Sequence, residues 1–136
     1  MSKETARKLE QIGVCAVDVG GFGGTNFAQI ENERRKQPLT YFNKWGMTTT
    51  VSIAEVATTT ERLSIIGSGG VQHALDVAKC IALGASAVGM AGYMLRLLIE
   101  QGVEALIEEI ERLHNDLTLI MTALGKIGRA SCRERV

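Results

Sequence analysis

Apolar residues follow two alternating patterns along the chain, one typical of buried strands and one typical of helices. Three short apolar runs without polar alternation predict parallel strands at 14–19, 64–67 and 86–89. Apolar residues that recur every three or four positions predict helices over 4–12, 71–83, 92–100 and 103–124. Two further helices are predicted around 28–36 and 50–60. Strand, glycine turn and helix, repeated three times, predict βαβ units in a parallel α/β sheet.

Three parallel strands are too few for a complete common fold, because the sheet would expose two edges. We therefore expect part of a doubly wound sheet or part of a (β/α)₈ barrel. A barrel would put helices on one face of the sheet and leave inner-face residues such as Val17 and Val88 without an opposite wall. Since Met1 precedes a predicted helix with no strand before it, we expect it to be an internal methionine of a longer, truncated protein.

The last ten residues, 127–136, break this pattern. The apolar period stops, and arginines stand at 129, 133 and 135. The string matches a translated sequencing adapter, so we interpret it as a non-native tail and predict that it packs on nothing. Without it, the remaining chain is slightly acidic, because the tail carries three arginines and one glutamate.

Composition narrows the classes of function. Fifteen basic and fifteen acidic residues give no net charge, which argues against a nucleic-acid partner held by a basic surface. No apolar run approaches the roughly 18–20 residues that cross a bilayer, and no signal peptide is visible at the N-terminus. Cys15, Cys80 and Cys132 lack metal-ligand spacing, which predicts a reduced, cytoplasmic chain. We expect Cys15 and Cys80 to be buried.

Glycines stand where each predicted strand meets its helix. The backbone N–H groups of a helix's first turn are unpaired there and can bind a phosphate. The run 68–72 offers three or four such groups and a serine hydroxyl, and the run 90–93 follows the next strand. A glycine taken alone is more often a tight turn. Two junctions one βα unit apart favour a shared phosphate site, as TIM barrels have after strands 7 and 8.

Several polar and aromatic residues near these loops have two possible roles. Thr25 and Asn26 either hydrogen-bond a cofactor or cap the next helix. We expect Asp18, near the end of a buried strand, to be a hydrogen-bonded structural residue rather than a catalytic base. Tyr41 and Trp45 either fasten their own loop or pack across a cofactor, and we favour the first.

The run VDVGGFGGTNF over 17–27, followed by IEN over 30–32 and by Arg35, resembles type 2 isopentenyl-diphosphate isomerase. The segments that agree with this family are Trp45-Gly46, 67–70, 75–79, 82–85 and 89–91. The match covers essentially residues 1–126. The first loop is quite specific, whereas Ser68-Gly69-Gly70 is shared by many FMN-binding barrels. The resemblance implies a partial TIM-barrel, FMN-binding domain over 1–126, with strands six, seven and eight.

The same resemblance implies an activity and its cofactors. The family converts isopentenyl diphosphate to dimethylallyl diphosphate, with reduced FMN as acid/base cofactor, NADPH as reductant and Mg²⁺; we expect the full-length enzyme to be a homo-oligomer without nucleic-acid or membrane partners. The FMN-binding residues implied are Gly20, Thr25, Ser68, Gly69, Gly70, Val71, Gln72, Ala91 and Gly92. Many relatives have serine at Gly20, arginine at Gln72 and a basic residue at Gly92, so phosphate binding here would depend more on backbone N–H groups.

The family's substrate-binding residues, its magnesium ligand and its flavin-facing lysine lie upstream of this chain. We therefore expect no catalytic residue and no metal ligand here, and an inactive fragment. Two alternatives stay open. One is a half-barrel that binds flavin or phosphate without activity. The other is a different FMN barrel such as a 2-hydroxy-acid oxidase, which would need a histidine-arginine pair on a loop after a strand, whereas His73 and His114 lie on predicted helices.

Overall fold

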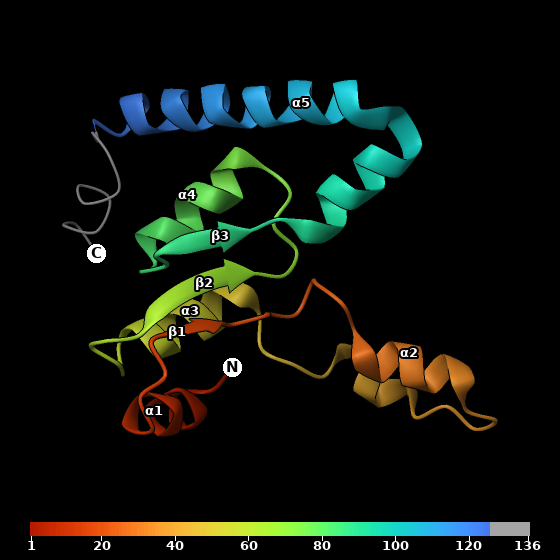
Figure 1. Ribbon diagram of the computed structural model, residues 1–136. Coiled ribbons are helices and arrows are strands. Elements are labelled where there is room, and N and C mark those ends of the chain that lie inside the picture. Colours follow the sequence, from red (N-terminus) through yellow and green to blue (C-terminus); the bar gives the residue numbers. More distant parts are fainter. Residues whose placement is uncertain (126–136) are drawn as a thin grey trace.

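The computed structural model describes residues 1–125, which form a three-stranded parallel sheet with helices packed against it (Figure 1). The strands are β1 (Ala16–Asp18), β2 (Ser64–Ser68) and β3 (Ala87–Gly89), and they pair in chain order. The register aligns Val17 with Ile65 and Gly67 with Val88. The predicted strands, their parallel direction and their order are confirmed.

The helices fall close to their predicted positions. They are α1 (Lys3–Gln11), α2 (Phe27–Arg34), the 3₁₀ helix η1 (Thr40–Lys44), α3 (Thr49–Ala57), α4 (Ala74–Ala82) and α5 (Ala91–Ala123). α4 begins at Ala74 rather than at 71. Gly70 has a φ of +75° and His73 is extended, so the helix cannot start before its N-cap at His73. The glycine run therefore precedes the helix as a loop.

The long helix α5 bends at Gly102, where φ is 91° and ψ is −176°. This bend confirms the break predicted between 100 and 103. The back half of α5 returns across α4, as Figure 1 shows. Its apolar stripe is only partly covered, and none of the helix's side chains is fully buried.

One face of the sheet is covered by helices and the other is open. Val17, Val19 and Ile65 are buried together with Ala6 of α1 and Ile53 of α3. The residues that alternate with them on the sheet, Ala16, Asp18, Ser64 and Ala87, are exposed. A barrel segment carries its helices on one face of the sheet, whereas a doubly wound sheet carries helices on both faces. The one-sided cover seen here is that of a barrel segment.

The expectation for Val17 and Val88 was wrong. Val17 is 6% exposed and lies in the core, and Val88 packs against that core from the same side, opposite Gly67. Side chains alternate between the two faces of a strand, so a shift by one residue reverses the assignment. The open face instead carries Asp18, Ile66 and Ser68.

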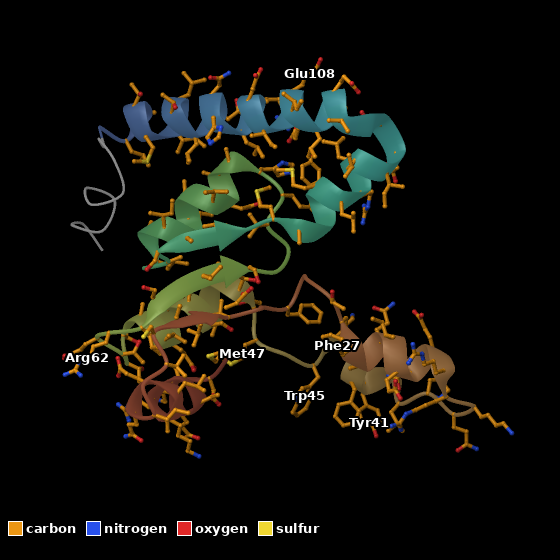
Figure 2. All side chains as sticks on the ribbon, in the orientation of Figure 1. Phe27, Tyr41, Trp45, Met47, Arg62 and Glu108 are labelled. Atoms are coloured by element: carbon orange, nitrogen blue, oxygen red, sulfur yellow. The ribbon has the colours of Figure 1, made fainter. Side chains whose placement is uncertain are left out.

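α2 and η1 project away from the sheet and contact each other (Figure 1). The buried Asn32 joins them, since it accepts from the Leu39 N–H at 3.0 Å and donates to the Leu39 carbonyl at 2.9 Å. Phe27, Tyr41 and Trp45 point outward from this projection, as Figure 2 shows. It is joined to the sheet through the glycine loop after β1.

The two described cysteines differ in their surroundings. Cys80 is buried as expected, and burial raises the pKa of its thiol. Cys15 is exposed, contrary to expectation, because just before β1 it is the neighbouring Val14 that packs against the core. Among residues 1–125, no helix combines the length and the apolar character that a bilayer crossing demands. The predicted tail, 127–136, lies outside the described residues.

Candidate functional site

The predicted binding loops leave the same edge of the sheet. All three strands run parallel, so their carboxyl ends meet at one edge. Ser68, the last residue of β2, is aligned with Gly89, the last residue of β3. The loop over 69–73 and the start of α5 therefore begin side by side, which the shared-site hypothesis requires.

The glycine loop after β1 (20–26) lies directly on the loop after β2. The Gly21 N–H donates to the Ser68 carbonyl at 2.9 Å. A Cβ on Gly69 would come within 2.2 Å of the Gly21 carbonyl oxygen, and one on Gly23 within 3.2 Å of the Gly70 Cα. Gly69 also has a φ of +100°. Close backbone approach and positive φ thus require glycine here whether or not a ligand binds.

Thr49, the first residue of α3, holds the end of β2 through side-chain hydrogen bonds. Its buried hydroxyl lies 3.0 Å from the Ser68 carbonyl oxygen and 2.6 Å from that of Gly69, so its single proton is shared between these two acceptors. In the sequence, Thr49 stands just before the helix predicted around 50–60, where the expected role of a threonine is to cap that helix. The cap itself is Thr48, which accepts from the Val51 N–H at 3.4 Å. Thr49 is therefore available for a hydrogen bond to the end of β2, which no spacing in the sequence indicates.

Backbone donors after β2 are fewer than expected. Within the described chain, the N–H groups of Gly70 and Val71 have no hydrogen-bond partner. The Val71 side chain lies in the core, so only its backbone can serve a ligand. The N–H groups of Gln72 and His73 both donate to the Asp76 carboxylate at 3.3 Å. The Gln72 donor is therefore engaged, and His73 is an exposed N-cap rather than a helical residue.

The start of α5 supplies further donors. Met90, its N-cap residue, makes no side-chain cap, and within residues 1–125 the N–H groups of Ala91 and Gly92 have no hydrogen-bond partner. A Cβ on Gly92 would meet nothing within 4 Å, so this position borders open space. Neutral N–H donors at a helix N-terminus suit a phosphate dianion. The start of α5 thus offers donors of the kind that bind a phosphate group.

Asp18 joins the loops after β1 and β2. Its Oδ1 accepts from the Gly20 N–H at 3.0 Å and from the Ser68 hydroxyl at 2.5 Å. The structural role expected for Asp18 is thus visible in its hydrogen bonds. The Ser68 hydroxyl proton is directed at this carboxylate, so the serine does not offer the free donor that the sequence suggested.

The polar residues after the β1 loop have separate roles. Asn26 caps α2 by accepting from the Gln29 N–H at 3.1 Å, and it donates to the Asn43 carbonyl at 2.6 Å. Thr25 is exposed and has no hydrogen-bond partner among residues 1–125. Of this pair, only Thr25 keeps its side chain available for a ligand.

The aromatic residues of η1 contact one another. The Phe42 ring lies 4.7 Å from that of Tyr41 and 5.7 Å from that of Trp45, centroid to centroid. Tyr41 and Trp45 are nevertheless 66% and 74% exposed. These ring contacts fasten η1 to the residue that follows it, which is the role favoured from the sequence. The outer sides of the Tyr41 and Trp45 rings remain exposed.

A polar cluster ties the back half of α5 to its start, next to the predicted site. The Tyr93 hydroxyl donates to Glu109 at 2.9 Å, and Arg112 donates to the same carboxylate at 2.6 Å. The Arg112 hydrogen bond holds the pKa of Glu109 below its ordinary value, and the bond to Glu109 raises the pKa of Tyr93. Sequence spacing gave no signal for this cluster, because the bend at Gly102 creates it.

A cleft of about 270 Å³ opens beside the glycine loops. Its walls come from both loops, the start of α3 and the outer side of α4, and include Gly70, Val71, Asp76 and Lys79. Neither Ala91 nor Gly92 lines it, so the cleft borders the β2 loop but does not include the start of α5. No group of three or more metal-ligating side chains occurs within the described part of the chain.

Curated relatives share much of this sequence. The chain is 68% identical over 125 residues to the isopentenyl-diphosphate delta-isomerase of a Geobacillus species, covering 92% of this chain and 36% of that protein. It is 61% identical, over the same length and share of each chain, to the isomerase of Bacillus cytotoxicus. The resemblance seen in the sequence is confirmed, and the chain spans about a third of the length of these relatives.

Solved flavoenzymes share its fold. A variant of flavocytochrome b2 with sulfite bound matches 98% of this chain and 32% of its own, with a TM-score of 0.74 and 22% identity. A lactate oxidase of Pediococcus acidilactici matches 99% and 33%, with a TM-score of 0.75 and 20% identity. At this identity the likeness concerns the fold alone.

The family pattern described as FMN-dependent dehydrogenase matches residues 1–134. This match covers nearly all of the chain, including the three strands, both glycine loops and the start of α5. The chain belongs to the FMN-dependent dehydrogenase family.

Proposed function

We propose that this chain is the segment carrying strands six to eight of a (β/α)₈ barrel, and that the whole enzyme converts isopentenyl diphosphate to dimethylallyl diphosphate with FMN. The observation that carries the activity is the 54–68% identity to curated isomerases over 125 residues. The one-sided helical cover of the sheet supports the barrel. The domain would span 1–126, with 127–136 as a non-native tail.

The flavin phosphate would be held from two adjacent loops. Gly70 and Val71 would donate their N–H groups from the loop after β2, and Ala91 and Gly92 from the start of α5. Gly69 lets the β2 loop pack on the β1 loop, where Gly20 and Thr25 would line the rim. The Gln72 N–H would join only after leaving Asp76.

When bound, FMN supplies an acid/base group for the substrate double bond. The residues of this chain would bind and orient the cofactor, and they contribute no group to the substrate diphosphate. NADPH and Mg²⁺ would act through residues outside this chain. We place the enzyme in the cytoplasm as a homo-oligomer without nucleic-acid or membrane partners.

A 2-hydroxy-acid oxidase activity has less support. The oxidases with this fold are 19–22% identical to the chain, against 54–68% for the isomerases. No histidine-arginine pair of the kind an oxidase needs is present within residues 1–125, because His114 is on the outer helix α5, and His73, although it ends the loop after β2, has no arginine on that loop (69–73). An inactive flavin-binding half-barrel describes the isolated chain rather than the whole enzyme.

A chimera tests the proposal. Residues 1–125 of this chain replace the matching 125 residues of the Geobacillus isomerase. We expect the purified chimera to bind FMN stoichiometrically and to isomerise isopentenyl diphosphate when NADPH and Mg²⁺ are present. The unmodified isomerase is the control. A folded chimera that binds FMN but does not isomerise the substrate would contradict the activity, and one that binds no FMN would contradict the site as well.

Gly70→Asp in this chimera tests the phosphate position. The aspartate brings bulk and like charge to the donors of the loop, so we expect FMN binding to be lost. Gly70→Asn is the matched control, because it has the same shape and the same backbone strain without the charge, and it should retain more FMN affinity. Titration of flavin fluorescence measures both. Equal affinity of the two variants would argue against a phosphate at this loop.

A further inference from the structure

Asp18 and Ser68 stand on the open face of the sheet, at the edge where the proposed flavin site lies. Asp18 is aligned with Ile66, and Ser68 follows two positions later on β2, so their side chains share the face away from α3. Neither residue contributes to the hydrophobic core, so apolar packing does not explain this pair.

The direction of the hydrogen bond limits what Ser68 can do. An ionised carboxylate only accepts hydrogen bonds, and a hydroxyl has one proton to give. Since the Ser68 proton goes to Asp18 at 2.5 Å, the serine oxygen offers only lone pairs to a ligand. A phosphate dianion also only accepts, and it is repelled by a nearby carboxylate. Ser68 is therefore unsuited to the phosphate.

Asp18 also holds the backbone of the neighbouring loop. The same Oδ1 accepts the Gly20 N–H at 3.0 Å, and Gly20 has a φ of +46°. One carboxylate oxygen therefore fixes two of the proposed site residues, which come from different strands. The backbone carbonyl of Ser68 has its own partners, since it accepts hydrogen bonds from the Gly21 N–H and the Thr49 hydroxyl.

We infer that Asp18 is a positioning residue of the flavin site, which turns Ser68 into an acceptor for a hydroxyl or ring N–H of the ligand and away from its phosphate. The inference rests on the proposed function. Asp18 acts through Ser68 and Gly20, and its effect falls on the part of the ligand that FMN shares with riboflavin.

The test measures the affinities of the chimera for FMN and for riboflavin, which lacks the phosphate. We expect Asp18→Ala and Ser68→Ala each to raise both dissociation constants by the same factor, about tenfold. The double variant should lose no more affinity than Asp18→Ala alone, because both changes remove the same hydrogen bond; alanine is used because asparagine would keep an acceptor oxygen at this position. The matched control is Glu104→Ala, at an exposed carboxylate on α5, and it should change neither constant.

Several outcomes would overturn the inference: unchanged affinities, a loss confined to FMN, or additive effects in the double variant. Should Asp18→Ala lower the thermal midpoint of the chimera strongly, Ser68→Ala carries the test, because it removes only the hydroxyl. An unmodified chimera that binds no FMN contradicts the proposed function. A chimera that binds FMN but is insensitive to both substitutions contradicts only the role of Asp18.

Discussion

At the edge of the sheet, the close approach of two loop backbones decides which positions must be glycine. A Cβ on Gly69 would come within 2.2 Å of the Gly21 carbonyl oxygen, and its φ of +100° disfavours any other residue. Gly92 faces open space at the start of a helix. We therefore expect Gly69→Ala to lower the free energy of unfolding of the chimera by about 3 kcal/mol. Gly92→Ala, the matched control, should change it by less than about 0.5 kcal/mol.

Urea unfolding at constant pH measures both glycine variants. Equal midpoints for the two variants would mean that the β1 and β2 loops do not pack against each other this closely.

Asp18 is a second residue whose role depends on a distant contact. Its position near the end of a strand was visible in the sequence, but its hydrogen-bond partner Ser68, fifty positions away, was not.

Among the elements, α5 depends on polar contacts that its own bend creates. Arg112 lowers the pKa of Glu109 below its ordinary value of 4.5, so the folded chain favours the charged carboxylate more than the unfolded chain does. This stabilisation is present above the ordinary pKa and is lost as the pH falls through the lowered one. We expect Glu109→Gln to lower the urea midpoint of the chimera at pH 7, and the difference from the unmodified chimera to shrink as the pH falls below 4.5.

Glu108→Gln is the control for the α5 variant, because Glu108 is the exposed neighbour of Glu109 on the same helix (Figure 2). A midpoint difference for Glu109→Gln that stays constant down to pH 3 would show that packing, rather than charge, holds the helix. The bend itself was predictable, since glycine interrupts an otherwise continuous apolar period.

At the scale of the whole molecule, the projection and α5 expose apolar surface. Phe27, Trp45 and Ile99 are 78%, 74% and 75% exposed. Exposed apolar side chains and unpaired strand edges favour association between copies. We expect the isolated chain to self-associate, as measured by light scattering after gel filtration, whereas the chimera should form one defined species. A monodisperse, cooperatively melting monomer of the isolated chain would count against the barrel-segment interpretation.

The sequence by itself determined the local structure of this protein. Apolar periodicity predicted the three strands and most helix positions, the glycine at 102 predicted the bend, and the run over 17–27 revealed the family. These features depend on neighbours in the chain, so a single sequence carries them.

Only the tertiary structure decided which partners meet. It placed Val17 in the core rather than on the open face, started α4 at Ala74, engaged the Gln72 donor with Asp76 and directed the Ser68 proton to Asp18. Each of these depends on the alternation phase of a strand, on a loop conformation or on contacts between distant residues. Such features are fixed when the elements pack together, and no spacing along the chain encodes them.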